Sequence, residues 1–569
     1  MATMTHLFPA IDKPTEAKSI RIILAMSAAG LTLSLLLLSS CSSQIFSKEQ
    51  ATIFEQATDA NVPPGLKNLT SSPDPAEPGP FHVCSRDYSF AGSGGTTRTG
   101  TFIVPALSNV NGSCLTHGRF PVLLIAHADA NGASTGGYDD LGEHLASNAI
   151  VVAIVDRKMV STDEFGALLV EHVDYIYEDS AIKDFVLKDL ALLGHSAGGA
   201  GIIQHAGAIE ALNGPVLGDP GDIDTKAIIL LASIVSLNLE KTFAGETPAL
   251  MGINIVNESD AAAFGPKQPG GIMASTFKIY DEAGLMPGNP DQLSLEKDML
   301  FVNAGAPISQ SGPSPHYFQN ALFAKAYINA FLQLHLRGHG IFRRFFKQQE
   351  KIPVSPGESS PLVFQQHAEP AQLLVANFED GSATEHELGG TIQASGTHIK
   401  NVVVGDAHQI DAFSPHHTKV MKFDWSLGDG GAATPGSIGP DLIRFQFDNP
   451  QDLRPYRYVS FRITQAFDPA TNPSGISRNM SVRLETQGGS ASVPISQHGG
   501  ELHFPIILGD SPVVSFNDGE TKNAMRTYVI PLRAFDGIDE AAVNELVLDF
   551  SDPEGESTIF LFDDVAFWF

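Results

Sequence analysis

Between residues 81 and 350, short apolar runs alternate with longer stretches in which apolar residues recur at helical spacing. The continuous apolar runs, which are typical of buried strands, lie at 120–126, 150–155, 190–193, 227–232, 249–256 and 299–303. Residues 138–147 and 321–336 have the periodicity of helices. Strands that alternate with helices predict βαβ units, and therefore an α/β domain with a mostly parallel sheet and flanking helices.

The pattern changes beyond residue 350. Proline, glycine and serine are frequent at 353–361, which predicts a linker over residues 351–370. After it, apolar and polar residues alternate with a period of two, in runs at 456–464, 480–486, 527–532, 545–550 and 558–562. Turns rich in Gly, Asp, Asn and Pro separate these runs, so the sequence predicts an all-β sandwich over residues 371–569.

The first residues have the order of an export signal. Basic residues precede an apolar run at 22–38, and small residues followed by Cys41 close it. The sequence Leu-Ser-Ser-Cys at 38–41 resembles the bacterial lipobox, which implies cleavage before Cys41 and attachment of a diacylglycerol to its thiol. We therefore expect a signal peptide and lipidation site over residues 1–41.

The residues after Cys41 predict how the chain is attached. Ser42 follows the cysteine where an aspartate would signal retention, so the resemblance implies an outer-membrane lipoprotein of a Gram-negative bacterium, held by its lipid alone. Residues 42–80 are rich in Ser, Pro, Asn and Asp, which is typical of a flexible tether. The alternative is an uncleaved membrane-spanning helix at 22–38.

Charge and cysteine content narrow the range of partners. The formal net charge is −29, so no basic surface is available in bulk for nucleic acid or for an anionic membrane. Once Cys41 is lipidated, only Cys84 and Cys114 remain, and in an oxidising compartment we expect them to form a disulfide. No Cys/His cluster has the spacing of a metal site, and His416 and His417 have the pattern of a surface pair.

Residues 194–199, Gly-His-Ser-Ala-Gly-Gly, match the nucleophile elbow of serine hydrolases. Such a serine lies on a strained turn between a strand and a helix, and the glycines two positions before and after it avoid collisions with neighbouring backbone. A second match, at 132–136, places Ser134 in a loop well beyond its strand. Ser196 directly follows a buried run and precedes a helix start, so we expect Ser196 to be the nucleophile.

Together with the run Phe-Pro-Val-Leu-Leu-Ile-Ala-His at 120–127 and the helical stretch at 138–147, this elbow resembles the α/β-hydrolases. The resemblance is to the group of dienelactone hydrolases, platelet-activating-factor acetylhydrolases and cutinase-like esterases, and it covers roughly residues 81–340. It implies an oxyanion hole of two backbone amides, from Ala197 and, by position, from Asp129. The loop at 127–132 departs from the usual His-Gly-aromatic pattern of the group, because Asp129 replaces the aromatic residue.

The family order of the triad is serine, acid, histidine. The acid follows the next-to-last strand, where Asp260 is the first choice, Glu258 the alternative and Asp281 a weaker option. The histidine precedes the closing helix, which points to His316. The two histidines at the far end of that helix, His335 and His339, are expected at the surface or as caps of its C-terminus.

The segments at 376–381 and 561–567 resemble those of galactose-binding-like jelly rolls, which are often appended to secreted polysaccharide-active enzymes. This resemblance implies glycan binding by the C-terminal domain and allows a structural calcium ion held by terminal acids. Trp425 and Trp568 both lie in this region. They offer surfaces for stacking on sugar rings, although core packing is the favoured interpretation.

The sequence as a whole predicts an exported, membrane-tethered carboxylic ester hydrolase. Ser196, His316 and Asp260 would act through an acyl-enzyme, with no catalytic metal or cofactor. One alternative is a catalytically degenerate hydrolase that serves as a cell-surface binding protein. Another is a peptidase or a dienelactone-type hydrolase that uses the same triad. The sequence does not distinguish a lipid, a polyester or an esterified glycan as the substrate.

Overall fold

A computed structural model gives the structure of the protein. It describes residues 53–56, 73–110, 113–127, 138–156, 164–211, 223–231, 233–235, 248–255, 274–286, 289–293, 295–303, 322–347, 352, 362–411, 414–425, 441–466, 477–502, 506–507, 521–522, 524–550 and 558–569. The predicted export signal, with Cys41, lies outside these residues, as do Asp129, Asp260 and His316. None of the described helices is both long enough and apolar enough to cross a membrane.

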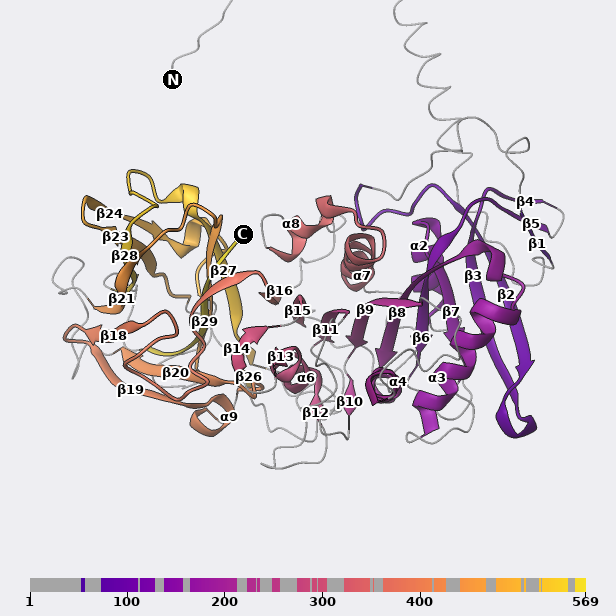
Figure 1. The fold of residues 1–569 in the computed structure, drawn as a ribbon, viewed down its shortest axis with the longest axis horizontal. Helices are drawn as coiled ribbons and strands as arrows, with labels where there is room; N and C mark the ends of the chain where they lie inside the picture. Colours follow the sequence, from indigo (N-terminus) through magenta and orange to yellow (C-terminus); the bar gives the residue numbers. More distant parts are fainter. Residues whose placement is uncertain are drawn as a thin grey trace, which may run out of the picture. The chain divides into compact units, whose positions relative to one another are not determined.

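A large mixed sheet forms the centre of the N-terminal part (Figure 1). Its strands follow the order β16-β15-β11-β9-β8-β6-β7-β3-β2. The six strands from β15 to β7 are parallel, whereas β16 at one edge and β3 and β2 at the other are antiparallel to their neighbours. The bounds are β2 His82–Ala91, β3 Thr97–Ala106, β6 Phe120–Ala126, β7 Val151–Val155, β8 Val186–His195, β9 Asp224–Leu231, β11 Ala249–Ile255, β15 Lys297–Asn303 and β16 Leu362–Ala368.

Helices cover both faces of this sheet. Successive side chains of a strand point to opposite faces, so Leu123 packs in the core under α2 and α7, whereas Leu124 packs in the core under α3, α4 and α6. The bounds are α2 Asp139–Ser147, α3 Phe165–Asp174, α4 Ala197–Ala211, α6 Thr276–Glu282 and α7 Leu322–His335. The mostly parallel α/β architecture expected from the alternating pattern is therefore present.

Short elements complete this part of the chain. The strands are β1 Ile53–Gln56, β4 Ser108–Val110, β5 Ser113–Thr116, β10 Ile234–Val235, β12 Ala274–Ser275, β13 Leu285–Met286 and β14 Asn289–Leu293. The helical turns are η3 Ser93–Gly95, η6 Tyr175–Asp179, η7 Lys183–Phe185, η10 Gly340–Phe342 and α8 Arg343–Phe346. The predicted disulfide is confirmed: Cys84 in β2 is bonded to Cys114 in β5, with their Cα atoms 6.0 Å apart.

Two antiparallel sheets form the C-terminal part. One has the order β19-β20-β29-β22-β27, with β17 also beside β29, and the other has the order β18-β21-β28-β23-β24. Their facing side chains make a single core that includes Phe445 and Phe562, whose rings lie 6.2 Å apart. The bounds are β17 Gln372–Ala376, β18 Gly390–Ser395, β19 Ile399–Asp406, β20 Lys419–Trp425, β21 Leu442–Gln451, β22 Tyr458–Gln465, β23 Ser481–Thr486, β24 Gly489–Pro494, β25 Ile506–Ile507, β26 Thr521–Lys522, β27 Arg526–Pro531, β28 Val543–Asp549 and β29 Thr558–Trp568, with α9 Ala407–Ile410, η11 Ile495–Gln497 and η12 Leu532–Ala534.

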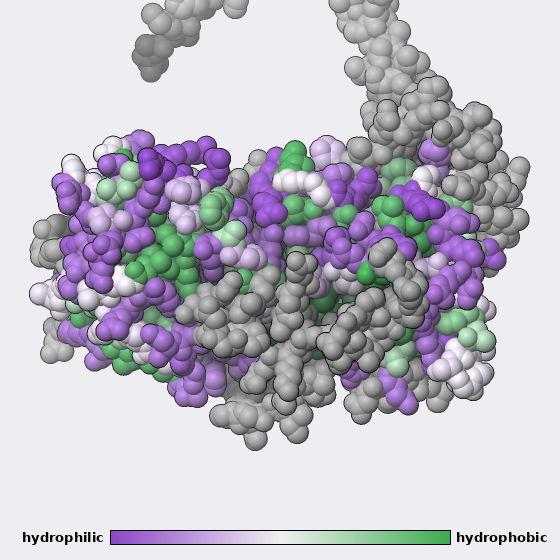
Figure 2. Space-filling model, viewed as in Figure 1, coloured by the Kyte–Doolittle hydropathy of each residue, from purple (hydrophilic) through white to green (hydrophobic). Residues whose placement is uncertain are grey.

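Both tryptophans of the C-terminal part belong to its interior. Trp425 is fully buried and donates from Nε1 to Asp441 Oδ2 at 3.1 Å. Trp568 is 2% exposed and donates from Nε1 to Gln372 Oε1 at 3.2 Å. Neither ring is open to solvent, so core packing accounts for both. Hydrophilic residues are spread over the described surface in Figure 2, which fits the net charge of −29.

The predicted linker at 351–370 differs from the structure in one respect. Its segment Leu362–Ala368 is the strand β16, which pairs with β15 and extends the α/β sheet. From this strand, Gln366 donates to the backbone oxygen of Met525 at 2.9 Å, and the amide of His367 donates to Thr527 Oγ1 at 3.1 Å. An exposed edge of a parallel sheet is a liability that proteins cover. The strand β16 covers this edge and ties it to β27.

Candidate active site

Ser196 lies at the junction of strand β8 and helix α4. Its φ angle is +51°, in the left-handed region, where an L-residue other than glycine is strained by about 1–2 kcal/mol. The amide of Ser196 donates to the backbone oxygen of Leu231, at the end of β9, at 2.9 Å. The serine therefore sits on a sharp, strained turn between a strand and a helix, and a neighbouring strand holds the turn in place.

The glycines on either side of Ser196 are required by close backbone contacts. A Cβ atom at Gly194 would lie 2.5 Å from the Cα atom of Gly199. A Cβ atom at Gly198 would lie 2.0 Å from the backbone oxygen of Ala126, the last residue of β6. This is the collision that the sequence predicts for these two positions. It also shows that the turn packs against the start of the loop that follows β6.

Two small residues that sequence analysis did not single out support the turn from behind. The hydroxyl of Ser233 donates to the backbone oxygen of Gly194 at 3.1 Å. The amide of Ser233 donates to the hydroxyl of Thr276, the first residue of α6, at 2.8 Å. Both residues are buried. No local pattern marks them, because their partners are distant in the sequence.

The residues on either side of the predicted oxyanion loop, His127 and Tyr138, lie close to the turn of Ser196. The residue that precedes the loop, His127, has its ring 6.1 Å from that of Tyr138, the residue that follows it. The phenol of Tyr138 in turn lies 2.6 Å from Nδ1 of His195. Asp129 itself lies outside the described residues. The amide of Ala197 opens α4, where the first amides have no partner within the helix and favour an anion.

The register of the sheet places the ends of the next strands beside Ser196. His195 pairs with Leu231 of β9, Leu231 pairs with Ile253 of β11, and Ile253 pairs with Leu300 of β15. Because these strands are parallel, β11 and β15 end at the same edge of the sheet as β8 (Figure 1). The segments that follow β11 and β15 therefore begin at the edge of the sheet where Ser196 lies.

The two remaining triad candidates belong to those segments. Asp260, like Glu258, lies within residues 256–273, directly after β11, and His316 lies within residues 304–321, between β15 and α7. All three positions are outside the described residues. Their place along the chain is the one that a triad at this edge requires, and their roles stay predictions.

The histidine at the end of α7 does not behave as a surface or capping residue. Burial lowers the pKa of His335 to about 4, so its ring is neutral near pH 7. Its ring packs at 4.4 Å from that of Phe331. Its Nε2 is buried and has no hydrogen-bond partner among the described residues, so His335 neither lies free at the surface nor caps the helix through this atom, and the expectation for it is wrong.

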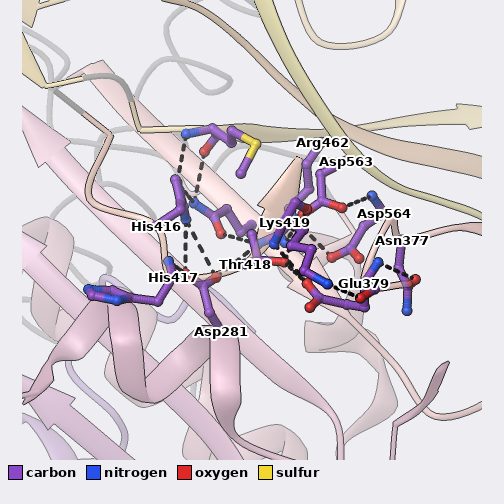
Figure 3. Close-up of polar contacts among 12 residues, drawn as sticks. Asp281, Asn377, Glu379, His416, His417, Thr418, Lys419, Arg462, Asp563 and Asp564 are labelled. Atoms are coloured by element: carbon purple, nitrogen blue, oxygen red, sulfur yellow. Dashed lines mark hydrogen bonds and ion pairs between the residues drawn. The ribbon is translucent and has the colours of Figure 1, made fainter. Parts of the chain in front are cut away.

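Asp281, the weaker option for the triad acid, belongs to a different network (Figure 3). Its carboxylate accepts from Arg462 Nη1 at 3.1 Å and lies 3.3 Å from Nδ1 of His416. Burial raises the pKa of Asp281, but His416 and Arg462 outweigh this and hold it well below its usual range. His416 is fully buried, so the expectation that it lies at the surface is wrong. Its acidic partner comes from a distant helix, which the local sequence did not reveal.

The terminal acids of the C-terminal part meet the same arginine. Arg462 donates from Nη2 to Asp563 at 2.5 Å and forms an ion pair with Asp564, whose carboxylate lies 2.9 Å from Nε. Glu379 accepts from the hydroxyl of Thr418 at 2.6 Å and from the amide of Lys419 at 2.9 Å.

These contacts bear on whether Glu379, Asp563 and Asp564 could hold a calcium ion. A calcium ion requires six to eight oxygen ligands, and an arginine among the ligands would repel it. Arg462 already supplies the positive charge that would balance these acids. A structural calcium ion here stays a prediction of the resemblance, and the described contacts do not require one.

A second acidic group lies where strands β15 and β16 pair, near the start of β15. Glu296, Asp298 and His367 offer ligand atoms within 4.8 Å of one another, a spacing that a metal ion could use. However, Asp298 is 2.8 Å from Nδ1 of His367, and Glu296 is 3.0 Å from Arg343. These charges are already paired within the described residues, so we assign no metal ion to them.

No protein-family model and no curated protein matches the chain. The solved structures that it resembles include the esterase Est22, with 13% sequence identity and a TM-score of 0.25. The match covers 30% of this chain and 64% of that structure, so the chain spans less than two thirds of the length of the structure it matches. At this level of similarity, no residue of Est22 can be assigned a counterpart here.

Proposed function

We propose that the α/β part of the chain is a serine hydrolase of the α/β-hydrolase type that cleaves carboxylic esters, with Ser196 as its nucleophile. The observation that carries the proposal is the left-handed φ angle of Ser196, +51°, at the end of β8. Backbone strain at a non-glycine residue persists only where the surrounding structure imposes it, and such strain gathers at active sites. Here the contacts of Gly194 and Gly198 impose it.

The mechanism follows from the edge of the sheet at which Ser196 lies. His316 would accept the proton of the Ser196 hydroxyl as its oxygen bonds to the ester carbonyl carbon, and Asp260 would orient the imidazole. The amides of Ala197 and Asp129 would stabilise the oxyanion. The protonated imidazole then gives its proton to the departing alcohol. Water, activated by the same imidazole, hydrolyses the acyl-enzyme and restores the serine.

A catalytically degenerate binding protein would not require the strained turn. A binding surface gains nothing from a serine whose backbone costs free energy, and a glycine at position 196 would remove that cost. A peptidase or a dienelactone-type hydrolase would use the same turn, so the geometry of Ser196 does not separate these from an esterase. Substrate tests must do so.

A fluorophosphonate probe tests the nucleophile directly. We expect the full chain to be labelled and the label to map to the peptide that contains Ser196. Ser196→Ala should abolish both labelling and the hydrolysis of p-nitrophenyl acyl esters. Ser134→Ala, at the second elbow-like match, is the matched control and should keep both. Labelling that persists in Ser196→Ala would disprove the assignment.

Substitutions at the other triad positions test the order of the triad. His316→Gln should reduce ester hydrolysis by about 10⁴-fold or more, as in other triads. Asp260→Asn should reduce it strongly, whereas Glu258→Gln should keep most of it; the reverse result would make Glu258 the acid. Hydrolysis of p-nitrophenyl esters but not of the matching anilides would exclude a peptidase.

We further propose that the chain is exported and attached to the outer membrane by a lipid on Cys41. The support is the sequence of the first 41 residues, in which an apolar run ends at a lipobox-like motif. Metabolic labelling with a radioactive fatty acid should mark the wild-type chain and not the Cys41→Ser variant. A fatty-acid label on Cys41→Ser would disprove attachment through this residue.

A further inference from the structure

An open cleft of about 510 Å³ lies at the edge of the α/β sheet opposite to Ser196. It is formed where β6 and β8 begin, where β3 ends and beyond the end of α7. Leu187, in its wall, precedes Ser196 by nine residues along β8, which is about 30 Å in an extended strand. The cleft is therefore separate from the proposed active site.

Two arginines lie in this cleft although the chain as a whole is strongly acidic. Arg119 and Arg337 line it beside the imidazole rings of His117 and His339, and Asp189 is the acidic residue of its described lining. Asp189 lies close enough to Lys226 and Tyr177 to influence both, beyond the cleft wall. In a chain with a net charge of −29, a cleft lined in this way attracts anions that the rest of the surface repels.

The two arginines of the cleft are not neutralised by carboxylates. Within the described part of the chain, neither Arg119 nor Arg337 forms an ion pair, in contrast to Arg98, Arg343 and Arg462. Arg337 is held by a single hydrogen bond, from Nη1 to the backbone oxygen of Ala149 at 3.1 Å. Burial lowers its pKa, which means that part of its hydration has been lost without a compensating anion. Guanidinium groups in this state bind carboxylates and phosphates well.

The remaining walls of the cleft are apolar. Phe81, Leu107, Phe120 and Leu336 line it, and the rings of Phe81 and Phe120 meet edge to face at 5.4 Å. Leu187 is 37% exposed and is one of the few large hydrophobic side chains that the described surface leaves open. The volume is that of a small-molecule site. Cationic and apolar groups in one cleft favour a ligand that has both an anionic and an apolar end.

We propose that this cleft binds an amphiphilic anion: a carboxylate or phosphate head group at Arg119 and Arg337, with a short apolar chain against Leu187 and its neighbours. A free fatty acid and a membrane phospholipid share this chemistry. A simple inorganic anion lacks the apolar part and should bind more weakly, and a neutral alcohol of the same chain length lacks the charge.

Calorimetric titration of the full chain, held in nanodiscs of neutral phosphatidylcholine, tests the proposal. The probes are octanoate, acetate, inorganic phosphate and octanol. We expect octanoate to bind more tightly than acetate, by about two- to fourfold for each methylene that the cleft buries. Octanol should bind at least about tenfold more weakly than octanoate, because a charge-assisted hydrogen bond is lost.

Single substitutions separate the two halves of the site. Arg119→Gln, at an exposed position, should weaken octanoate binding by about tenfold and leave octanol unchanged. Leu187→Ser should weaken octanoate and leave acetate unchanged. Arg533→Gln, an exposed arginine of the C-terminal part, is the matched control and should have no effect. Equal octanoate affinity in Arg119→Gln and Arg533→Gln, or no octanoate binding by the wild type, would overturn the proposal.

A final comparison identifies the source of the ligand. If the cleft takes a phospholipid from the membrane, nanodiscs that contain phosphatidylglycerol should compete with octanoate and lower its apparent affinity. Unchanged affinity would assign the site to a free amphiphile. Either result requires the dependence on Arg119 described above.

Discussion

The phenol of Tyr138 lies 2.6 Å from Nδ1 of His195, the residue that directly precedes the proposed nucleophile. Tyr138 is 7% exposed and His195 is 8% exposed, so the bond is shielded from water. Tyr138 ends the loop that would carry the second oxyanion amide, and His195 ends the strand that carries Ser196. The bond therefore fixes the two halves of the proposed oxyanion hole relative to each other, which catalysis by fixed dipoles requires.

Tyr138→Phe tests this role. The variant should lose a buried hydrogen bond and about 1–2 kcal/mol of stability. It should also lower kcat for ester hydrolysis by about tenfold with little change in KM, because the loop would be less well fixed in the transition state. Tyr88→Phe is a matched control, since the Tyr88 hydroxyl bonds to His172 at 2.8 Å on another part of the sheet. Equal loss of kcat in both variants would show a general effect of stability.

Gly198→Ala tests the close packing behind the serine. Its methyl group would lie 2.0 Å from the backbone oxygen of Ala126, so the turn or the end of β6 must move. We expect a loss of about 1–3 kcal/mol in the free energy of unfolding, together with a loss of most esterase activity. Gly340→Ala is the control, because a Cβ atom at that position meets no other atom within 4 Å. Normal activity in Gly198→Ala would separate the turn geometry from catalysis.

The sequence revealed the parts of the fold that local chemistry determines. The run at 120–126 is a strand at those bounds, because an uninterrupted apolar run suits a strand buried on both faces. Gly194 and Gly198 mark the turn at Ser196, because a side chain at either position would collide with neighbouring backbone. The edge strand β2 was missed, because it is half-exposed and its apolar residues are too few to form a run.

Contacts between distant residues could not be predicted in this way. His416 was expected at the surface because its neighbours are polar, but its partner Asp281 precedes it by 135 residues. The same holds for Arg462, which meets acids from two distant segments of the chain, α6 and β29. For the candidate active site, the sequence identified the turn of Ser196 but not the supports Ser233 and Thr276. Their roles depend on which strands become neighbours.

Arg462→Met should be strongly destabilising. The arginine is buried, and its removal leaves the buried carboxyl groups of Asp281 and Asp563 without the cation that pairs with both. Breaking such a group typically costs about 3–5 kcal/mol, which denaturant unfolding would measure. The stability of Arg462→Lys should lie between those of Arg462→Met and the wild type, because lysine keeps the positive charge but not the forked geometry of the guanidinium group. Arg454→Met is the control: its side chain is 66% exposed, so the substitution should leave the midpoint of denaturant unfolding unchanged. A stable Arg462→Met would show that these acids have another partner.

Removal of calcium by EDTA tests whether the terminal acids bind a calcium ion. Since Arg462 and Lys419 already contact the terminal acids, we expect EDTA to leave the melting temperature of the wild type unchanged. The control is the Arg462→Met variant, in which added calcium should restore part of the lost stability if the freed oxygens can hold the ion. A fall in the wild-type melting temperature with EDTA, reversed by calcium, would instead establish the structural calcium ion that the jelly-roll resemblance allows.

The pair formed by His367 and Asp298 predicts a loss of stability at alkaline pH. Burial alone would lower the pKa of His367, but Asp298, at 2.8 Å, and Glu369 raise it to about 10. Burial raises the pKa of Asp298 to about 6, so this carboxylate is ionised across the alkaline range.

The sign of the effect follows from the raised pKa. An unfolded histidine titrates near 6.5. The stabilisation from His367 is therefore complete below about pH 6.5 and is lost progressively as the pH rises through about 10. His367→Gln should flatten the decline of the melting temperature over this interval. His82→Gln, at an exposed position, should keep the wild-type decline. A His367→Gln variant with the same slope as the wild type would mean that His367 is neutral in the folded protein.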